Sequence, residues 1–241
     1  MRAFLIGGGR DSIAAHRPFA DAVGPANRVV VYLLDEQDAQ PDRWSAELAA
    51  AGLAHSTVIT VSAERPARPE DLDDAAGVYV AGGLTPGYRD VLVDGGTGWL
   101  DRVRADGLIY AGFSAGSAIA AQHALVGGWQ VAVNGRTVAA VHEDVGEDLE
   151  ALTIADGLGI VPFMIDVHAA QWGTLQRLIY AVLGSSGPGV GWALDEATTL
   201  EVEDGVPVAV HGTGAATLVR ADGGAASVSI HLAGDDLTLL G

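Results

Sequence analysis

A serine stands in the setting that a nucleophile requires. Residues 112–116 read Gly-Phe-Ser-Ala-Gly, with Ser114 at the centre, and fit the pattern G-x-S-x-G. A nucleophile in such a turn is held in a strained conformation between a strand and a helix, so it needs small neighbours on both sides. The start of the following helix favours the negative charge that develops on an attacked carbonyl oxygen. Because the chain has 33 glycines, the alternative reading is a closely packed strand–helix turn without chemistry.

A nucleophilic serine needs a base, and the chain has seven histidines. His168 follows a strand-like run and precedes a helical pattern, which places it at the rim of a sheet as either the base or a capping residue. His123 would lie about two turns along the helix that follows Ser114, too far to reach back. His211 and His231 fall in a hairpin-rich tail and are most simply surface or edge residues. His168 is therefore the strongest candidate for the base.

The first half of the chain alternates short apolar runs with amphipathic stretches, which is typical of a parallel sheet with helices on both faces. We expect strands over Ala3–Ile6, Arg28–Leu34, Thr57–Val61, Gly77–Ala81 and Leu108–Ala111. We expect helices near Pro41–Ala51, Pro69–Ala76, Gly87–Val93, Trp99–Ala105 and Ala115–Leu125. Ser114 then stands between the last of these strands and the last of these helices.

After about residue 125 the pattern changes, because glycine turn signals separate short Val- and Thr-rich stretches. These stretches predict hairpin strands over Gln130–Val133, Thr137–Val141, Thr198–Val202, Val206–Val210 and Ala216–Val219. One further helix is expected over Ala169–Leu183. The sequence thus predicts a single α/β domain over residues 1–241, with a mostly parallel sheet flanked by helices and an antiparallel, hairpin-rich C-terminal extension.

Charge and composition exclude several classes of function. The chain has 31 acidic and 13 basic residues, and its net charge of −18 repels nucleic acid and anionic membrane surfaces. It has no cysteine, so a disulfide, a thiolate metal site and a cysteine nucleophile are excluded. The glycine loop Gly7–Gly9 does not fit the dinucleotide pattern G-x-G-x-x-G. With no signal peptide or membrane span visible, we expect a cytoplasmic protein.

Several motifs together resemble one family. Ser114–Ser117 (Ser-Ala-Gly-Ser), Asp166–His168 (Asp-Val-His) and Gly191–Thr198 (Gly-Trp-Ala-Leu-Asp-Glu-Ala-Thr) resemble the serine peptidase family of peptidase E and cyanophycinase. The resemblance extends to the Gly82-Gly83 pair and to residues 208–219, so it covers nearly the whole chain with the motifs in order. It implies the fold of class I glutamine amidotransferases, with a flavodoxin-like sheet and serine in place of their cysteine.

The resemblance also implies roles at the site. Ser114 would be the nucleophile and His168 the general base, and the N–H groups of Gly83 and Ala115 would form the oxyanion hole. The implied reaction is hydrolysis of a small peptide through an acyl-enzyme, without a metal or organic cofactor, and we expect a monomer or a homodimer.

The third member of such a site is an acid, which in the family lies roughly two dozen residues before the histidine. That position falls in the acidic segment 142–148. We expect Asp144 to be the acid, with Glu143 and Glu147 as alternatives.

The sequence departs from the family where the substrate would bind. Arginines that hold an acidic substrate side chain in the family are replaced by Trp172 and Thr174, and only the later Arg177 remains. A guanidinium binds a carboxylate through two parallel hydrogen bonds that Trp and Thr cannot replace. We therefore expect Trp172 and Thr174 to line a site that is not strictly specific for Asp-X peptides and takes a neutral or cationic peptide. Trp172 would be an apolar or cation–π wall, or else pack its own helix.

Two other functions remain open from the sequence. An α/β-hydrolase esterase would place its histidine last, at His211 or His231, which the hairpin-rich tail and the family motifs disfavour. A family member without activity would serve as a binding or regulatory protein, although the presence of both Ser114 and His168 favours activity.

Overall fold

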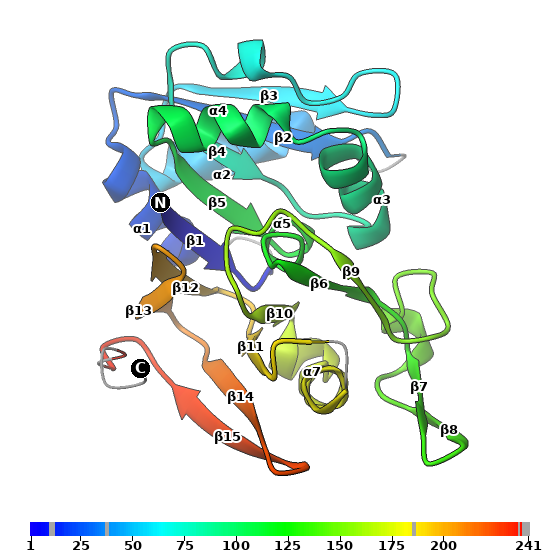
Figure 1. The fold of residues 1–241 in the computed structure, drawn as a ribbon. Coiled ribbons are helices and arrows are strands. Elements are labelled where there is room, and N and C mark those ends of the chain that lie inside the picture. Colours follow the sequence, from blue (N-terminus) through cyan, green and yellow to red (C-terminus); the bar gives the residue numbers. More distant parts are fainter. Residues whose placement is uncertain (10–12, 37–38, 185–186, 236, 238–241) are drawn as a thin grey trace.

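Two sheets organise the molecule. The structure is a computed structural model that describes residues 1–9, 13–36, 39–184, 187–235 and 237 (Figure 1). A seven-stranded sheet has the order β13-β12-β1-β5-β4-β2-β3, and a four-stranded sheet has the order β10-β11-β14-β15. Two short two-stranded sheets, β6-β9 and β7-β8, project beside them.

Five neighbouring strands of the larger sheet are parallel, from β1 to β3 in the order given above. They are β1 (Arg2–Ile6), β2 (Arg28–Leu34), β3 (Ser56–Val61), β4 (Ala75–Val80) and β5 (Ile109–Phe113). The strands β12 (Thr198–Glu203) and β13 (Val206–Gly212) add an antiparallel edge beside β1. Strands buried on both faces favour nearly continuous apolar runs, and β2 is such a run because six of its seven residues are buried.

Helices cover both faces of this sheet (Figure 1). In β2 and β4, Tyr32 and Tyr79 point to opposite faces, because Tyr79 is paired with Val31. Tyr32 packs on Trp99 of α4 (Gly98–Asp106), and Tyr79 packs on Trp44 of α2 (Pro41–Ala51). The two helices therefore lie on opposite faces.

The other helical elements are short, except for α1 and α7. They are α1 (Ile13–Val23), η1 (Pro69–Leu72), α3 (Thr85–Arg89), η2 (Asp90–Asp94), α5 (Ala115–Ala118), η3 (Glu143–Val145), α6 (Ala169–Trp172) and α7 (Leu175–Leu183). α1 lies on the same face as α2, since its Phe19 also contacts Tyr79. Burying a side chain of this size contributes roughly 1.5–3 kcal/mol, so the aromatic contacts hold the layers together.

The second half of the chain forms the smaller sheets. The four-stranded sheet contains β10 (Met164–Val167), β11 (Val190–Leu194), β14 (Ala216–Asp222) and β15 (Ala225–His231). β10 and β11 are parallel, and α7 packs on this sheet. The hairpin strands are β6 (His123–Gly127), β7 (Gln130–Val133), β8 (Arg136–Ala139) and β9 (Thr153–Asp156).

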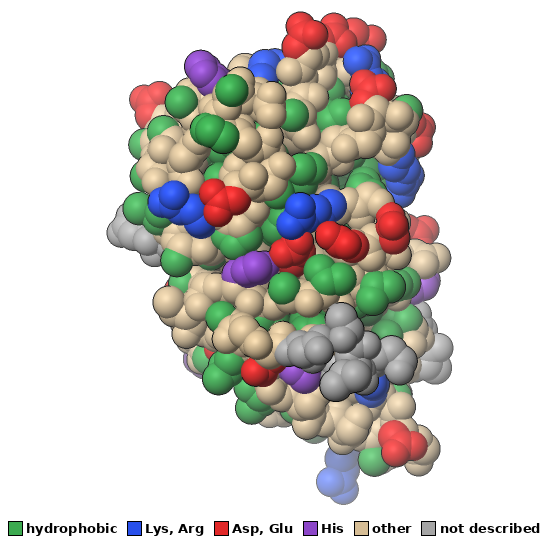
Figure 2. Space-filling view, turned by 90° about the vertical axis from the view of Figure 1, so that its left-hand side faces the viewer, with side chains coloured by type: hydrophobic (Ala, Val, Ile, Leu, Met, Phe, Trp, Pro, Cys, Tyr) green, Lys and Arg blue, Asp and Glu red, His purple; other side chains and the backbone are tan. Residues whose placement is uncertain are grey.

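Charged side chains of both signs gather across the face turned to the left in Figure 1. Figure 2 shows them as a band across the middle of that face, with hydrophobic side chains scattered between them. Across the described residues, no helix combines the length and the apolar character needed to cross a lipid bilayer.

The predicted fold class, a mostly parallel α/β sheet with helices and antiparallel hairpins, is confirmed. Three element predictions were wrong. Pro69–Ala76 holds only the single turn η1 before β4, and Ala169–Leu183 is interrupted at Gly173, where φ is +71°. The helix over Ala115–Leu125 stops at Ala118, because the next carbonyls accept hydrogen bonds from residues 158–161. His123 consequently begins strand β6.

Candidate active site

The turn at Ser114 is strained in the way that its sequence predicts. Ser114 has φ +50° and ψ −111°, between the end of β5 and the start of α5. Its N–H donates to Ile6 O at 2.9 Å. A Cβ at Gly112 would overlap the carbonyl of Gly116, and a Cβ at Gly116 would overlap that of Val80. The two glycines are therefore needed for close backbone approach, and the fold holds Ser114 in a conformation that L-residues rarely adopt.

His168 faces Ser114. It follows β10 directly and also has a positive φ, +54°. Its Nε2 lies 2.8 Å from Ser114 Oγ, and its Nδ1 lies 2.8 Å from Glu196 Oε1. Both Ser114 and His168 are buried. Serine, imidazole and carboxylate thus form a continuous hydrogen-bonded array.

Parallel strands bring His168 and Glu196 together. In β10 and β11, Val167 is paired with Leu194. His168 is the first residue after β10, and Glu196 is the second after β11, so both lie at the carboxyl edge of the same strand pair. The main chain of Glu196 is fixed as well, because its N–H donates to Gln171 Oε1 at 2.9 Å.

The glycine loop after β1 makes room for this pair. A Cβ at Gly8 would overlap the His168 ring, and a Cβ at Gly9 would lie 2.9 Å from Glu196 Cβ. The carbonyl of Gly7 accepts the His168 N–H at 3.0 Å. Gly8 and Gly9 also have positive φ, +105° and +101°. This loop supports the histidine and the acid directly.

Burial and the neighbouring Glu196 shift the pKa of His168 in opposite directions. Burial lowers its pKa below the ordinary value, while the hydrogen bond and the charge of Glu196 raise it. The net shift is downward, so the imidazole is neutral at neutral pH. A carboxylate accepting from Nδ1–H leaves the Nε2 lone pair facing the serine hydroxyl. This arrangement can accept a proton from Ser114.

A second glycine turn lies against Ser114. A Cβ at Gly82 would be 3.1 Å from Ser114 Cβ, so the Gly82–Gly83 turn packs directly on the serine. Within the described part of the chain, the N–H groups of Gly83 and Ala115 have no hydrogen-bond acceptor. Two free backbone donors beside a nucleophile are what an oxyanion hole requires.

The expected acid, Asp144, does not reach His168. Its side chain is exposed, and its Oδ2 lies 3.4 Å from Nδ1 of His142. Glu143 is also exposed, and Glu147 accepts the Thr85 N–H at 3.0 Å. The prediction was wrong because the partner of His168 Nδ1 is Glu196, which follows β11, and not a residue of segment 142–148. Glu196 stands in one of the motifs that carry the family resemblance, and its place after a parallel strand was the signal that could have identified it.

Trp172 lies at the site and Thr174 does not. The Trp172 indole stacks on the His168 ring, with centroids 3.7 Å apart and an interplanar angle of 9°. It is 44% exposed and lines the cavity in front of Ser114. Thr174 is fully buried, and its hydroxyl donates to Val167 O at 2.7 Å, so it does not line the cavity as the sequence led us to expect.

Arg177 is occupied inside the protein. Its guanidinium makes two hydrogen bonds to Asp166, at 2.9 and 2.8 Å, and one to Val145 O at 2.8 Å. The coulombic and hydrogen-bonding contributions of Asp166 raise the pKa of Arg177 against the lowering effect of burial. Arg177 therefore ties the acidic segment to the strand that carries His168 and is not available to a substrate carboxylate.

The histidines of the esterase alternative lie elsewhere. His211 Nε2 is 2.7 Å from Glu201 Oε2, and His231 Nε2 is 3.0 Å from Ser229 Oγ. The geometry therefore favours His168 over both as the partner of Ser114. Across the described residues, no three His, Cys, Asp or Glu side chains come together as metal ligands.

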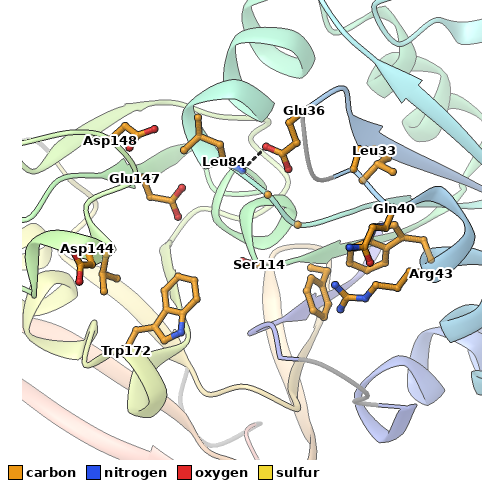
Figure 3. Close-up of a pocket in the computed structure, with 16 residues that line it drawn as sticks. Leu33, Glu36, Gln40, Arg43, Leu84, Ser114, Asp144, Glu147, Asp148 and Trp172 are labelled. Atoms are coloured by element: carbon orange, nitrogen blue, oxygen red, sulfur yellow. Dashed lines mark hydrogen bonds between the residues drawn. The ribbon is translucent and has the colours of Figure 1, made fainter.

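A cavity of about 620 Å³ opens in front of Ser114. Figure 3 shows Ser114 at its floor, Trp172 on one side, and Gln40 and Arg43 on the opposite side. Four acidic side chains also line it, namely Glu36, Asp144, Glu147 and Asp148. Ser114 is thus accessible from a cavity large enough for a short peptide.

Comparisons with known proteins give the fold. No protein-family model and no curated protein sequence matches this chain. A peptidase from an acI-B1 Actinobacterium has a similar crystal structure, with a TM-score of 0.63 and 15% identity over 97% of this chain and 95% of that one. A putative peptidase E from Listeria monocytogenes EGD-e gives a TM-score of 0.51 and 15% identity, over 96% and 98% of the two chains. The chain therefore shares the fold of peptidase E-like structures.

Proposed function

We propose that the protein is a serine peptidase that hydrolyses small peptides. The observation that carries this proposal is the array Ser114–His168–Glu196, with both hydrogen bonds at 2.8 Å, at the floor of an open cavity. The likeness in fold to structures named peptidase and putative peptidase E supports the same reaction class.

In the proposed reaction, His168 Nε2 takes the proton from Ser114 Oγ as the oxygen attacks the scissile carbonyl carbon. The N–H groups of Gly83 and Ala115 stabilise the negative charge on the carbonyl oxygen. His168 then returns the proton to the leaving amine, and an acyl-enzyme remains on Ser114. Water, deprotonated by His168, attacks the acyl carbon, and the bond to Ser114 Oγ breaks as His168 returns the proton to that oxygen and the carboxylic acid product leaves. Glu196 stabilises the imidazolium in both steps.

Besides lining the cavity, Trp172 would stabilise the charged form of His168 in the proposed reaction. Its indole lies parallel to the imidazole, so its π face is directed at the ring that becomes cationic in the transition state. The stack also covers one side of His168 from solvent.

The proposal is tested with a panel of dipeptides and short peptides, with products identified by mass spectrometry. We expect cleavage by the wild type and none above background by Ser114→Ala. Cleavage that persists in Ser114→Ala, or a wild type that cleaves no peptide in the panel, would contradict the proposal. The panel includes Asp-X dipeptides, which we expect to be poor substrates because Arg177 is occupied by Asp166.

A further inference from the structure

Glu36 lies beside the turn that would form the oxyanion hole. It follows β2 by two residues, and its Oε2 accepts the Leu84 N–H at 3.4 Å. A Cβ at Gly83 would overlap Glu36 Oε1, so the carboxylate lies directly against this glycine. The preceding residue, Gly82, packs on Ser114. Glu36 is therefore separated from the nucleophile by a single turn of backbone.

A second carboxylate approaches the same turn from the other side. Glu147 Oε2 accepts the Thr85 N–H at 3.0 Å, and its backbone has φ +57°. Figure 3 shows Glu36 and Glu147 on either side of Leu84, at the wall of the cavity. Backbone amides of one turn thus fix two acidic groups that come from distant parts of the sequence. Groups held in this way meet a ligand without first losing conformational freedom.

The charge balance of the cavity is negative. Besides these two glutamates, Asp144 and Asp148 line it. Arg43 is the cationic side chain among the described residues that line the cavity, and its charge is already engaged. Its Nε lies 2.6 Å from Glu47 Oε1, and its guanidinium packs over the Trp44 ring, 5.0 Å from the centroid.

A fixed carboxylate beside an oxyanion hole opposes the reaction, because two negative charges repel strongly where water is partly excluded. A positive charge on the bound substrate would offset this repulsion, and a negative one would add to it. The acidic wall therefore disfavours the transition state of an uncharged substrate and favours that of a substrate with a positive charge. This is a way to gain specificity through rejection of the wrong substrate.

We propose that Glu36, supported by Glu147, is a specificity-determining residue that selects substrates with a protonated amine or a guanidinium on the residue whose carbonyl Ser114 attacks. This inference rests on the proposed peptidase function. The positive group has two sources, the free α-ammonium of an N-terminal residue or the side chain of Lys or Arg, and the experiment separates them.

The test uses a neutral fluorophosphonate and measures its rate of reaction with Ser114 in the presence of four competing amides. Lysinamide carries both positive charges, and Nα-acetyl-lysinamide carries only the one on its side chain. Norleucinamide carries only the α-ammonium, and Nα-acetyl-norleucinamide carries no charge. We expect the cationic amides to protect Ser114 at concentrations about 10- to 100-fold lower than the uncharged one, the range for a hydrogen bond to a charged group. Of the two singly charged amides, the one that protects Ser114 at the lower concentration identifies the source of the positive group.

Glu36→Gln separates a role in specificity from a role in folding. We expect this variant to lose most of the preference for cationic amides and to react several-fold faster with the neutral fluorophosphonate, because the repelling charge is gone. Damage to the fold would slow the reaction with the probe instead. Glu147→Gln provides a second variant with the same expected direction. Glu143→Gln is the matched control, because Glu143 is exposed and lies outside the cavity lining.

The outcomes distinguish this inference from the proposed function. Reaction at Ser114 that all four amides suppress equally, or a preference that survives in both Glu36→Gln and Glu147→Gln, would overturn the inference and leave the peptidase proposal standing. A wild type whose Ser114 does not react with the fluorophosphonate would overturn the proposed function, and this inference with it.

Discussion

Replacement of Glu196 by glutamine removes one negative charge from the array and keeps its shape. The carboxylate lies 2.8 Å from His168 Nδ1, and in the proposed mechanism it stabilises the imidazolium that forms when the serine is deprotonated. Glutamine retains an oxygen that accepts the Nδ1–H, so the main loss is electrostatic. We expect a lower kcat/KM at unchanged fold.

The burial of His168 and Glu196 sets the size of the expected loss in kcat/KM. Two unit charges about 4 Å apart interact by about 1 kcal/mol in bulk water and about 4 kcal/mol at an effective dielectric constant of about 20. The His168 side chain is 7% exposed and that of Glu196 29%, so an intermediate value of about 2.5 kcal/mol is appropriate. This corresponds to a loss of about 70-fold in kcat/KM.

The pH dependence provides an independent check. Burial lowers the pKa of His168, and Glu196 partly counteracts this effect. Because the neutral imidazole is the base, the activity of the wild type should fall on the acid side only below about pH 6.5, the ordinary histidine value. In Glu196→Gln the raising contribution is lost, so the acid limb should move to still lower pH while the plateau falls.

The assay is kcat/KM against pH for the best peptide of the panel. Asp144→Asn is the comparison variant, and Glu143→Gln is the control for a change of surface charge. The reasoning is refuted if Asp144→Asn loses as much activity as Glu196→Gln, or if the acid limb of Glu196→Gln moves to higher pH.

Three further predictions follow from the packing around His168. Gly8→Ala places a methyl group against the His168 ring, at a residue whose φ is +105°. We expect kcat/KM to fall by at least about 100-fold, the scale of a small misplacement of a reacting group, while circular dichroism shows a folded protein. Near-normal activity would contradict the role of the loop. Arg177→Met leaves Asp166 buried without its partner, and the free energy of unfolding, measured in urea, should fall by about 3–5 kcal/mol. A change below about 1 kcal/mol would contradict the structural role given to this ion pair. Trp172→Ala removes the stack on His168 and should reduce kcat by about 5- to 30-fold, the effect of about 1–2 kcal/mol. Trp172→Phe should retain most of the wild-type kcat. Equal losses of kcat in both variants would argue against stacking.

The sequence predicted those parts of the site that depend on local patterns. The turn at Ser114 has a fixed spacing of small residues, and His168 follows an apolar run, so both were placed correctly beside a sheet edge. The early end of the helix after Ser114 was missed, because a short apolar run cannot be told from a continuing helix by its pattern alone. In the structure, Ile119 and the two alanines that follow it accept hydrogen bonds from residues 158–161, which lie far along the chain.

The acid was predicted wrongly for a physical reason. The position of the acid in the resembling family suggested Asp144, but contact with His168 depends on which strand lies beside β10 in space. That strand is β11, and its register places Glu196 next to the histidine. Register between distant strands is a tertiary property that one sequence without its structure does not reveal.

The central claim is that Ser114 is a nucleophile activated by His168. The most direct measurement is reaction with a fluorophosphonate, followed by intact-mass analysis and mapping of the modified peptide. We expect one adduct per chain, on Ser114 in the wild type, none in Ser114→Ala, and a strongly reduced rate in His168→Ala. An adduct that persists in Ser114→Ala, or that forms equally fast in His168→Ala, would contradict the claim.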